Sequence, residues 1–94
     1  MSESLRGLPS ELTEPYLAKT IGILWDRFER SEKTREHYRT LWDSMRALNL
    51  LTVVACKNGI GSRASLVMAS KLGDVAKFVK AEIGVNPYRE WRVA

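Results

Sequence analysis

The first half of the chain carries apolar residues at the spacing of amphipathic helices. Over residues 14–30 they recur every three or four positions, which predicts a helical run that Gly22 divides into two shorter helices. A second apolar stripe predicts a helix from about residue 33 to 48 that ends near Asn49. The members of this stripe are Tyr38, Leu41, Trp42, Met45 and Leu48. Residues 1–9 are predicted to be a loose lead-in to these helices.

The pattern changes after residue 49, where short apolar segments replace the helical spacing. Residues 50–56 (LLTVVAC) are rich in β-branched side chains and predict a strand, and residues 57–63 (KNGIGSR) predict a tight turn. Residues 64–70 (ASLVMAS) allow two interpretations. As a strand, they complete a β-hairpin over 50–70. As part of one helix over 62–83, they follow a strand and a glycine loop, as in a phosphate-binding unit.

The hairpin interpretation predicts the α+β fold class. In this interpretation Gly73 breaks the chain, and Asp74 caps a last helix that ends at Gly84. The helices, the hairpin and the last helix then form one small winged-helix-like domain over residues 10–84. An aromatic and basic tail, residues 85–94, follows this domain.

The composition narrows the possible function classes. The chain of 94 residues suffices for one domain, and its 15 basic and 11 acidic residues leave a net charge of +4. The longest uncharged stretch, residues 47–56, is far shorter than the roughly 20 apolar residues of a membrane span. A single cysteine, Cys56, favours a reducing, cytoplasmic setting, and a single histidine, His37, supplies no metal cluster. Because no catalytic constellation is visible, we expect no enzymatic activity, no cofactor and no membrane contact.

The basic residues are unevenly distributed along the chain. Residues 1–49 contain eight basic and eight acidic side chains, whereas residues 50–94 contain seven and three. No acidic residue occurs between Asp43 and Asp74. A surface with basic groups and no acids attracts polyanions, so this interval favours a contact with nucleic acid. The alternative is that the excess is an ordinary solubility charge.

The order of predicted elements over residues 35–79 resembles winged-helix DNA-binding domains, among them the winged-helix ends of archaeal origin-recognition ATPases. The resemblance implies that the helix before the hairpin enters the major groove and that the hairpin, the wing, touches phosphate or the minor groove. Independently, Arg35, Arg39 and Arg46 share the outer face of that helix, and arginine binds guanine edges or phosphates. The alternative is a solvated face with ion pairs within the helix. The predicted DNA-binding residues are Arg35, Arg39, Thr40, Arg46, Lys57, Asn58, Arg63 and Lys71.

The predicted function is therefore double-stranded DNA binding by a small regulator or replication accessory. We expect a homodimer, because one domain of this size makes few contacts with DNA. The alternative is a protein-interaction module, for example a phage or plasmid protein that binds a host factor. The neutral, helix-rich first half and the aromatic tail favour it, with Tyr88 and Trp91 as contacts with a partner or a second subunit.

The segment TVVACKNGIGS also resembles the phosphocysteine loop of the sugar phosphotransferase IIB proteins, in which a cysteine ends a strand before a glycine-containing loop. This resemblance implies that Cys56 carries a phosphoryl group, which loop N–H groups and a helix dipole stabilise. The implied cradle consists of Asn58, Gly59, Gly61 and Ser62. The simpler interpretation is that Cys56 is a small core residue.

Overall fold

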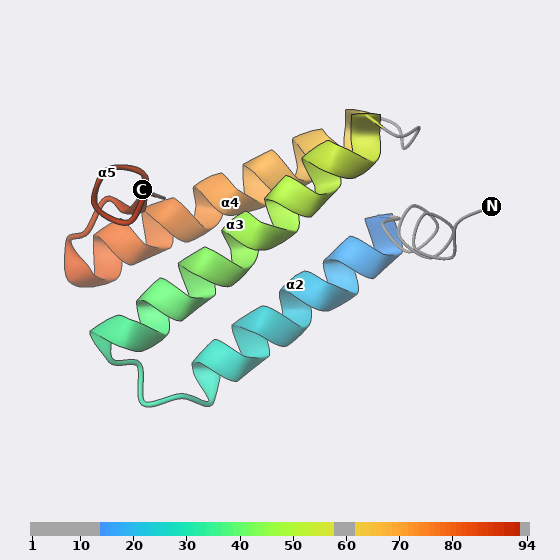
Figure 1. Cartoon of the computed structure of the whole chain (residues 1–94). Coiled ribbons are helices and arrows are strands. Elements are labelled where there is room, and N and C mark those ends of the chain that lie inside the picture. Colours follow the sequence, from blue (N-terminus) through green and yellow to red (C-terminus); the bar gives the residue numbers. More distant parts are fainter. Residues whose placement is uncertain (1–13, 58–61, 93–94) are drawn as a thin grey trace.

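Three long helices lie side by side in the computed structural model, and a short helix packs at one end of them (Figure 1). The structure describes residues 14–57 and 62–92, without the side chains of Cys56, Lys57 and Ser62. The described helices are α2 (Glu14–Glu29), α3 (Arg35–Lys57), α4 (Ser62–Ile83) and α5 (Pro87–Glu90). α3 and α4 run antiparallel and make the most extensive contact, so they form a helical hairpin against which α2 packs.

The predicted β-hairpin is wrong, because the described residues contain no strand. Residues 50–57 continue α3, and residues 62–70 begin α4. The α+β fold class is therefore replaced by an all-helical fold in the part of the chain that the structure describes. The other interpretation of residues 64–70, one helix over 62–83, is confirmed for the helix itself, but the strand that should precede it is absent.

The cause of this error lies in residues 47–55. The buried positions of this part of α3 are Leu48, Thr52 and Ala55, and the exposed large apolar ones are Leu50, Leu51 and Val54. Apolar side chains therefore lie on the exposed side of the helix here as well as on its buried side. This arrangement produces a largely apolar run in the sequence, interrupted only by Asn49 and Thr52, and periodicity alone does not distinguish such a run from a buried strand.

Three predicted boundaries inside the helices are also wrong. Gly22 lies within α2, and α3 continues through Asn49. Gly73 and Asp74 lie within α4, so neither breaks nor caps a helix. Gly84, which has a φ of 70°, directly follows the end of α4, as predicted. This left-handed backbone conformation favours glycine, which has no Cβ atom.

Replacing Gly22 with alanine is expected to raise the free energy of unfolding by about 0.5–1 kcal/mol, because alanine loses less backbone entropy inside a helix. A Cβ atom at this position would meet no atom within 4 Å. The matched control, Gly84→Ala, should lower the free energy of unfolding by about 1–2 kcal/mol, since a Cβ disfavours the left-handed backbone. Urea unfolding measures both changes. A destabilising Gly22→Ala would contradict a continuous α2.

The core of the helical bundle changes in composition from one end to the other. At the end where α2 leads into α3, neighbouring aromatic rings pack with their centroids 4.8 to 6.2 Å apart. These rings belong to Trp25, Phe28, Tyr38 and Phe78. At the hairpin end, where α3 leads to α4, the buried side chains of these two helices are those of Thr52, Ala55, Ala64 and Met68, none of which is aromatic. Aromatic pairs add about 0.5–1.5 kcal/mol beyond their buried area, so they strengthen the first end.

Tyr38 connects this aromatic end to α4 through a polar contact. Its hydroxyl donates a hydrogen bond of 3.4 Å to the Oε1 atom of Glu82. Burial raises the pKa of Tyr38, and the carboxylates of Glu82 and Glu29 raise this pKa further because they repel the phenolate. The hydroxyl therefore stays a donor to Glu82 at neutral pH.

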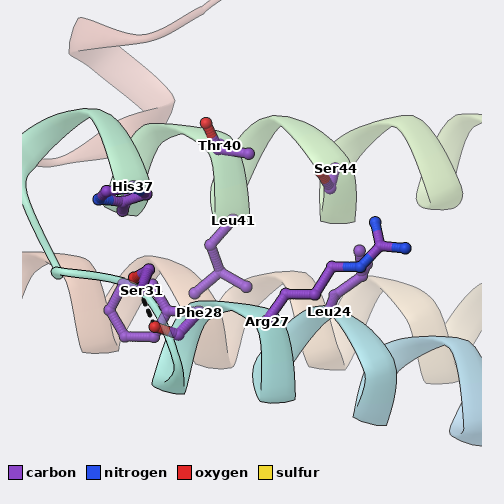
Figure 2. Close-up of a pocket in the computed structure, with 8 residues that line it drawn as sticks. All are labelled: Leu24, Arg27, Phe28, Ser31, His37, Thr40, Leu41 and Ser44. Atoms are coloured by element: carbon purple, nitrogen blue, oxygen red, sulfur yellow. Dashed lines mark hydrogen bonds between the residues drawn. The ribbon is translucent and has the colours of Figure 1, made fainter.

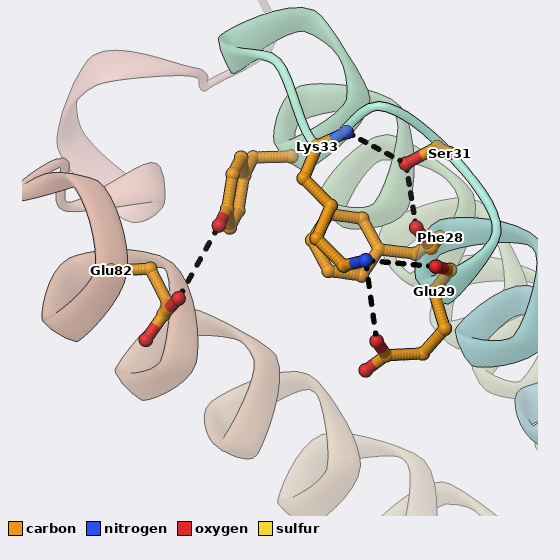
Figure 3. Close-up of polar contacts among 6 residues, drawn as sticks. Phe28, Glu29, Ser31, Lys33 and Glu82 are labelled. Carbon is orange, nitrogen blue, oxygen red and sulfur yellow. Dashed lines mark hydrogen bonds and ion pairs between the residues drawn. The ribbon is translucent and has the colours of Figure 1, made fainter.

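Hydrogen bonds and an ion pair between nearby residues stabilise the short connection between α2 and α3 (Figure 3). The Ser31 hydroxyl donates to the carbonyl of Phe28 and accepts the N–H of Lys33 at 3.1 Å. The Lys33 ammonium lies 2.8 Å from the carbonyl and 3.6 Å from the carboxylate of Glu29. These contacts fix the conformation of the chain between the end of α2 and the start of α3.

Candidate interaction surface

The arginines of α3 that were predicted to face DNA have partners within the chain. The Nε atom of Arg39 lies 3.6 Å from one carboxylate oxygen of Asp43, and a guanidinium nitrogen of Arg46 lies 3.2 Å from the other. Arg46 also donates to the carbonyl of Trp91 at 2.7 Å. The Arg35 guanidinium lies 5.8 Å from the ring centroid of Trp91. These contacts agree with the alternative of ion pairs within the helix.

The other predicted DNA-binding residues lie in separate parts of the molecule. Arg63, at the start of α4, pairs with the first glutamate of α2 at 3.0 Å, and Lys71 is exposed further along α4. Thr40 lines a cavity between α2 and α3. The side chain of Lys57 and the whole of Asn58 lie outside the described residues. Among the described residues, only the three arginines of α3 come together, and DNA binding stays a prediction.

The two aromatic residues of the tail differ in their surroundings. Trp91, predicted to contact a partner, is only 5% exposed and belongs to the core. The side chain of Asn86 caps α5 by accepting the N–H of Tyr88 at 3.1 Å, and the Tyr88 ring packs edge-on against Trp42 at 5.0 Å. Tyr88 is nevertheless 53% exposed. Of this pair, it is the Tyr88 ring that remains accessible to a partner.

The segment that resembles a phosphocysteine loop does not have the arrangement this resemblance implies. Cys56 lies in the last turn of α3 instead of at the end of a strand, and Ser62 begins α4. Asn58, Gly59 and Gly61 lie outside the described residues. Within the described ranges, no three His, Cys, Asp or Glu side chains are grouped so that they could hold a metal ion.

An exposed apolar surface lies on the second half of α3. Leu50, Leu51 and Val54 are 54%, 46% and 49% exposed. With Ala47, they occupy the spacing i, i+3, i+4 and i+7, which places them on one face of the helix, opposite the core. We call Ala47, Leu50, Leu51 and Val54 the α3 strip. Leu66 of α4, at the same end of the hairpin, is 70% exposed.

A cavity of about 120 Å³ opens between α2 and α3 (Figure 2). Its apolar lining consists of Leu24, Phe28 and Leu41, and its polar lining consists of Arg27, Ser31, His37, Thr40 and Ser44. The side chain of Arg27 extends from α2 toward α3. Within the described part of the chain, Arg27 has no carboxylate partner, whereas its neighbours Asp26 and Arg30 pair with each other at 3.1 Å. No local sequence signal predicts this cavity, because it depends on how two helices are placed.

Comparison with known proteins gives no relative: no protein-family model, no curated protein and no solved structure matches this chain. Among the described helices, none combines the length and the apolar character that crossing a bilayer requires. The function is therefore inferred from the α3 strip and the cavity beside it.

Proposed function

We propose that this chain is a protein-interaction module that binds its partner through the α3 strip. The observation that carries the proposal is the exposure of Leu50 and Leu51, about half of each, next to each other on one face of α3. An apolar helix face is normally packed against another surface. A protein partner that covers the strip would complete this burial.

The exposed leucines can supply a useful share of the binding free energy. Full burial of one leucine side chain contributes about 1.5–3 kcal/mol. Leu50 and Leu51 are 54% and 46% exposed, so covering them both would contribute about that amount in total. This contribution corresponds to a roughly ten- to hundredfold change in Kd. Clustered exposed apolar residues on a small protein commonly mark a protein-binding site.

Double-stranded DNA binding is the second candidate function, and the acid-free interval over residues 44–73 favours it. This interval covers the second half of α3 and the first half of α4, which is the same end of the hairpin. It ranks second because Arg46 and Arg63, two basic residues of this interval, form ion pairs within the chain. The homodimer that was predicted together with DNA binding also remains a prediction.

A photo-crosslinking amino acid at position 50, introduced in the cells that express the chain, is expected to capture one specific protein. The same group at position 77, an exposed position on α4, should not capture it. The captured protein, once purified, should bind the Leu50→Ser, Leu51→Ser double variant about tenfold more weakly than the wild type, because two apolar contacts are lost. Isothermal titration calorimetry measures both Kd values.

Lys77→Ser is the matched control, because it also changes an exposed side chain but lies outside the α3 strip. It should leave the Kd unchanged, and the melting temperatures of both variants should stay near that of the wild type. Equal affinity of the wild type and the double variant would contradict the proposal. Binding of a DNA duplex in place of a protein would support the second candidate.

A further inference from the structure

Two exposed apolar side chains follow the cavity along α2 and α3, toward the hairpin end. On α2, Ile23 lies one turn before Arg27 and is 44% exposed. On α3, Leu51 lies seven residues after Ser44, on the same side of the helix, and is 46% exposed. Because α2 and α3 lie antiparallel beside each other (Figure 1), positions 23 and 51 both lie on the hairpin side of the cavity. We call the cavity together with Ile23 and Leu51 the α2–α3 groove.

The cavity has the size and lining for one apolar side chain. Leu24, Phe28 and Leu41 give it apolar walls, and its volume is about 120 Å³. A cavity of about 150 Å³ lined by such residues holds a benzene molecule, so this one suits a single leucine or isoleucine side chain. It is too small for most cofactors and drug-sized ligands, which occupy about 300–1,000 Å³.

The positive charge of Arg27 at the cavity favours an acidic ligand. Arg27 lines the cavity, and no carboxylate group is among the residues that line it. The nearby acidic side chains of α2 are engaged elsewhere, since Asp26 pairs with Arg30 at 3.1 Å and Glu29 with Lys33 at 3.6 Å. A guanidinium group binds a carboxylate through two parallel hydrogen bonds, which gives Arg27 a geometric preference for Asp or Glu.

We infer that the partner enters the α2–α3 groove as an amphipathic helix that seats one apolar side chain in the cavity and presents a carboxylate to Arg27. This inference rests on the proposed function, because the groove and the α3 strip share Leu51. The incoming helix would pack as a further long helix of the bundle, at the usual interaxial distance of about 8–10 Å. Its carboxylate would lie about one turn from its apolar anchor, since Arg27 lies between Leu24 and Phe28 on α2.

A fluorescein-labelled, stapled, alanine-rich helix of 16 residues tests this inference. One version carries a leucine stripe with Glu one turn from the central leucine, and two others carry Gln or Lys in place of Glu. Fluorescence anisotropy with the full chain should show that the Glu peptide binds about fivefold more tightly than the Gln peptide. Arg27→Gln should remove this difference, and Arg27→Glu should make the Lys peptide the tightest of the three. The matched control, Arg30→Gln, should preserve the wild-type order, because Arg30 is exposed directly after the end of α2 and pairs with Asp26.

Filling the cavity gives a second, independent measurement. Ser44→Phe should raise the Kd of the Glu and Gln peptides equally, by about tenfold. The phenylalanine ring would fill the cavity that otherwise receives the apolar side chain of the peptide. In wild-type spectra, the peptide should shift the amide resonances of Leu24 and Leu41, which line the cavity. Equal affinity of the Glu and Gln peptides for the wild type overturns the inference. Sedimentation that shows a dimer closing the groove also overturns it, because a second copy would then be the occupant.

The failure of this inference and that of the proposed function are distinguishable. If the Arg27 series fails while the captured protein still depends on Leu50 and Leu51, the groove inference is wrong and the proposed function stands. If the dependence on Leu50 and Leu51 is absent as well, both are wrong.

Discussion

Trp42→Ala is expected to lower the free energy of unfolding by about 3–5 kcal/mol, because removing a large buried aromatic side chain leaves a cavity. The side chain is 1% exposed on α3, and its ring packs against Tyr88 of α5 at 5.0 Å. The substitution therefore loosens the attachment of α5 as well as the core. A domain of this length has a total stability of about 5–14 kcal/mol, so the variant loses a large fraction of it.

Urea unfolding followed by circular dichroism measures this loss, with Trp42→Phe as the matched control. The indole Nε1 atom is buried without a hydrogen-bond partner among the described residues, so phenylalanine forfeits no hydrogen bond there. We therefore expect the phenylalanine variant to lose less than half as much stability as the alanine variant. A loss below about 1 kcal/mol for alanine would contradict the burial of Trp42.

Leu51→Pro should lower the free energy of unfolding by about 3 kcal/mol or more. Position 51 lies in the interior of α3, where proline removes the N–H bond to the carbonyl of Ala47 and its ring clashes with that carbonyl. The side chain of Leu51 is 46% exposed, so the loss of its packing contributes little.

Leu51→Ala separates the backbone effect from the side-chain effect, and it should cost less than about 1 kcal/mol. Urea unfolding gives both values, and circular dichroism at 222 nm should show a loss of helix for the proline variant alone. This comparison bears directly on the predicted strand over residues 50–56. Similar costs for proline and alanine would mean that position 51 lies outside a regular helix.

The first half of α3 could be predicted from the sequence because only one of its faces is apolar. The five members of the stripe are all buried, as expected; they are Tyr38, Leu41, Trp42, Met45 and Leu48. Their polar neighbours on the outer face leave one unambiguous helical period. In the second half both faces are apolar, and this period is lost. The helical spacing of Ala47, Leu50 and Val54 is nevertheless consistent with a helix that continues.

The surroundings of the site residues depend on contacts between distant parts of the chain. The hydrogen bond from Arg46 to the Trp91 carbonyl joins residues 45 positions apart, and nothing local indicates that Trp91 is buried. The same holds for the cavity beside Arg27, whose lining comes from two helices. The uneven charge was visible in the sequence, but the pairing of Arg63 with Glu14 was not.

The difference between the aromatic and the hairpin end of the core has a consequence for local opening. Amides near Tyr38 are held by clustered rings, whereas amides near Thr52 are held by smaller side chains and should exchange with solvent sooner. The hairpin end is therefore expected to open at a lower free energy than the aromatic end. A partner bound to the α3 strip would add its binding free energy at this end. Binding of the partner would therefore also raise the free energy needed to open the hairpin end.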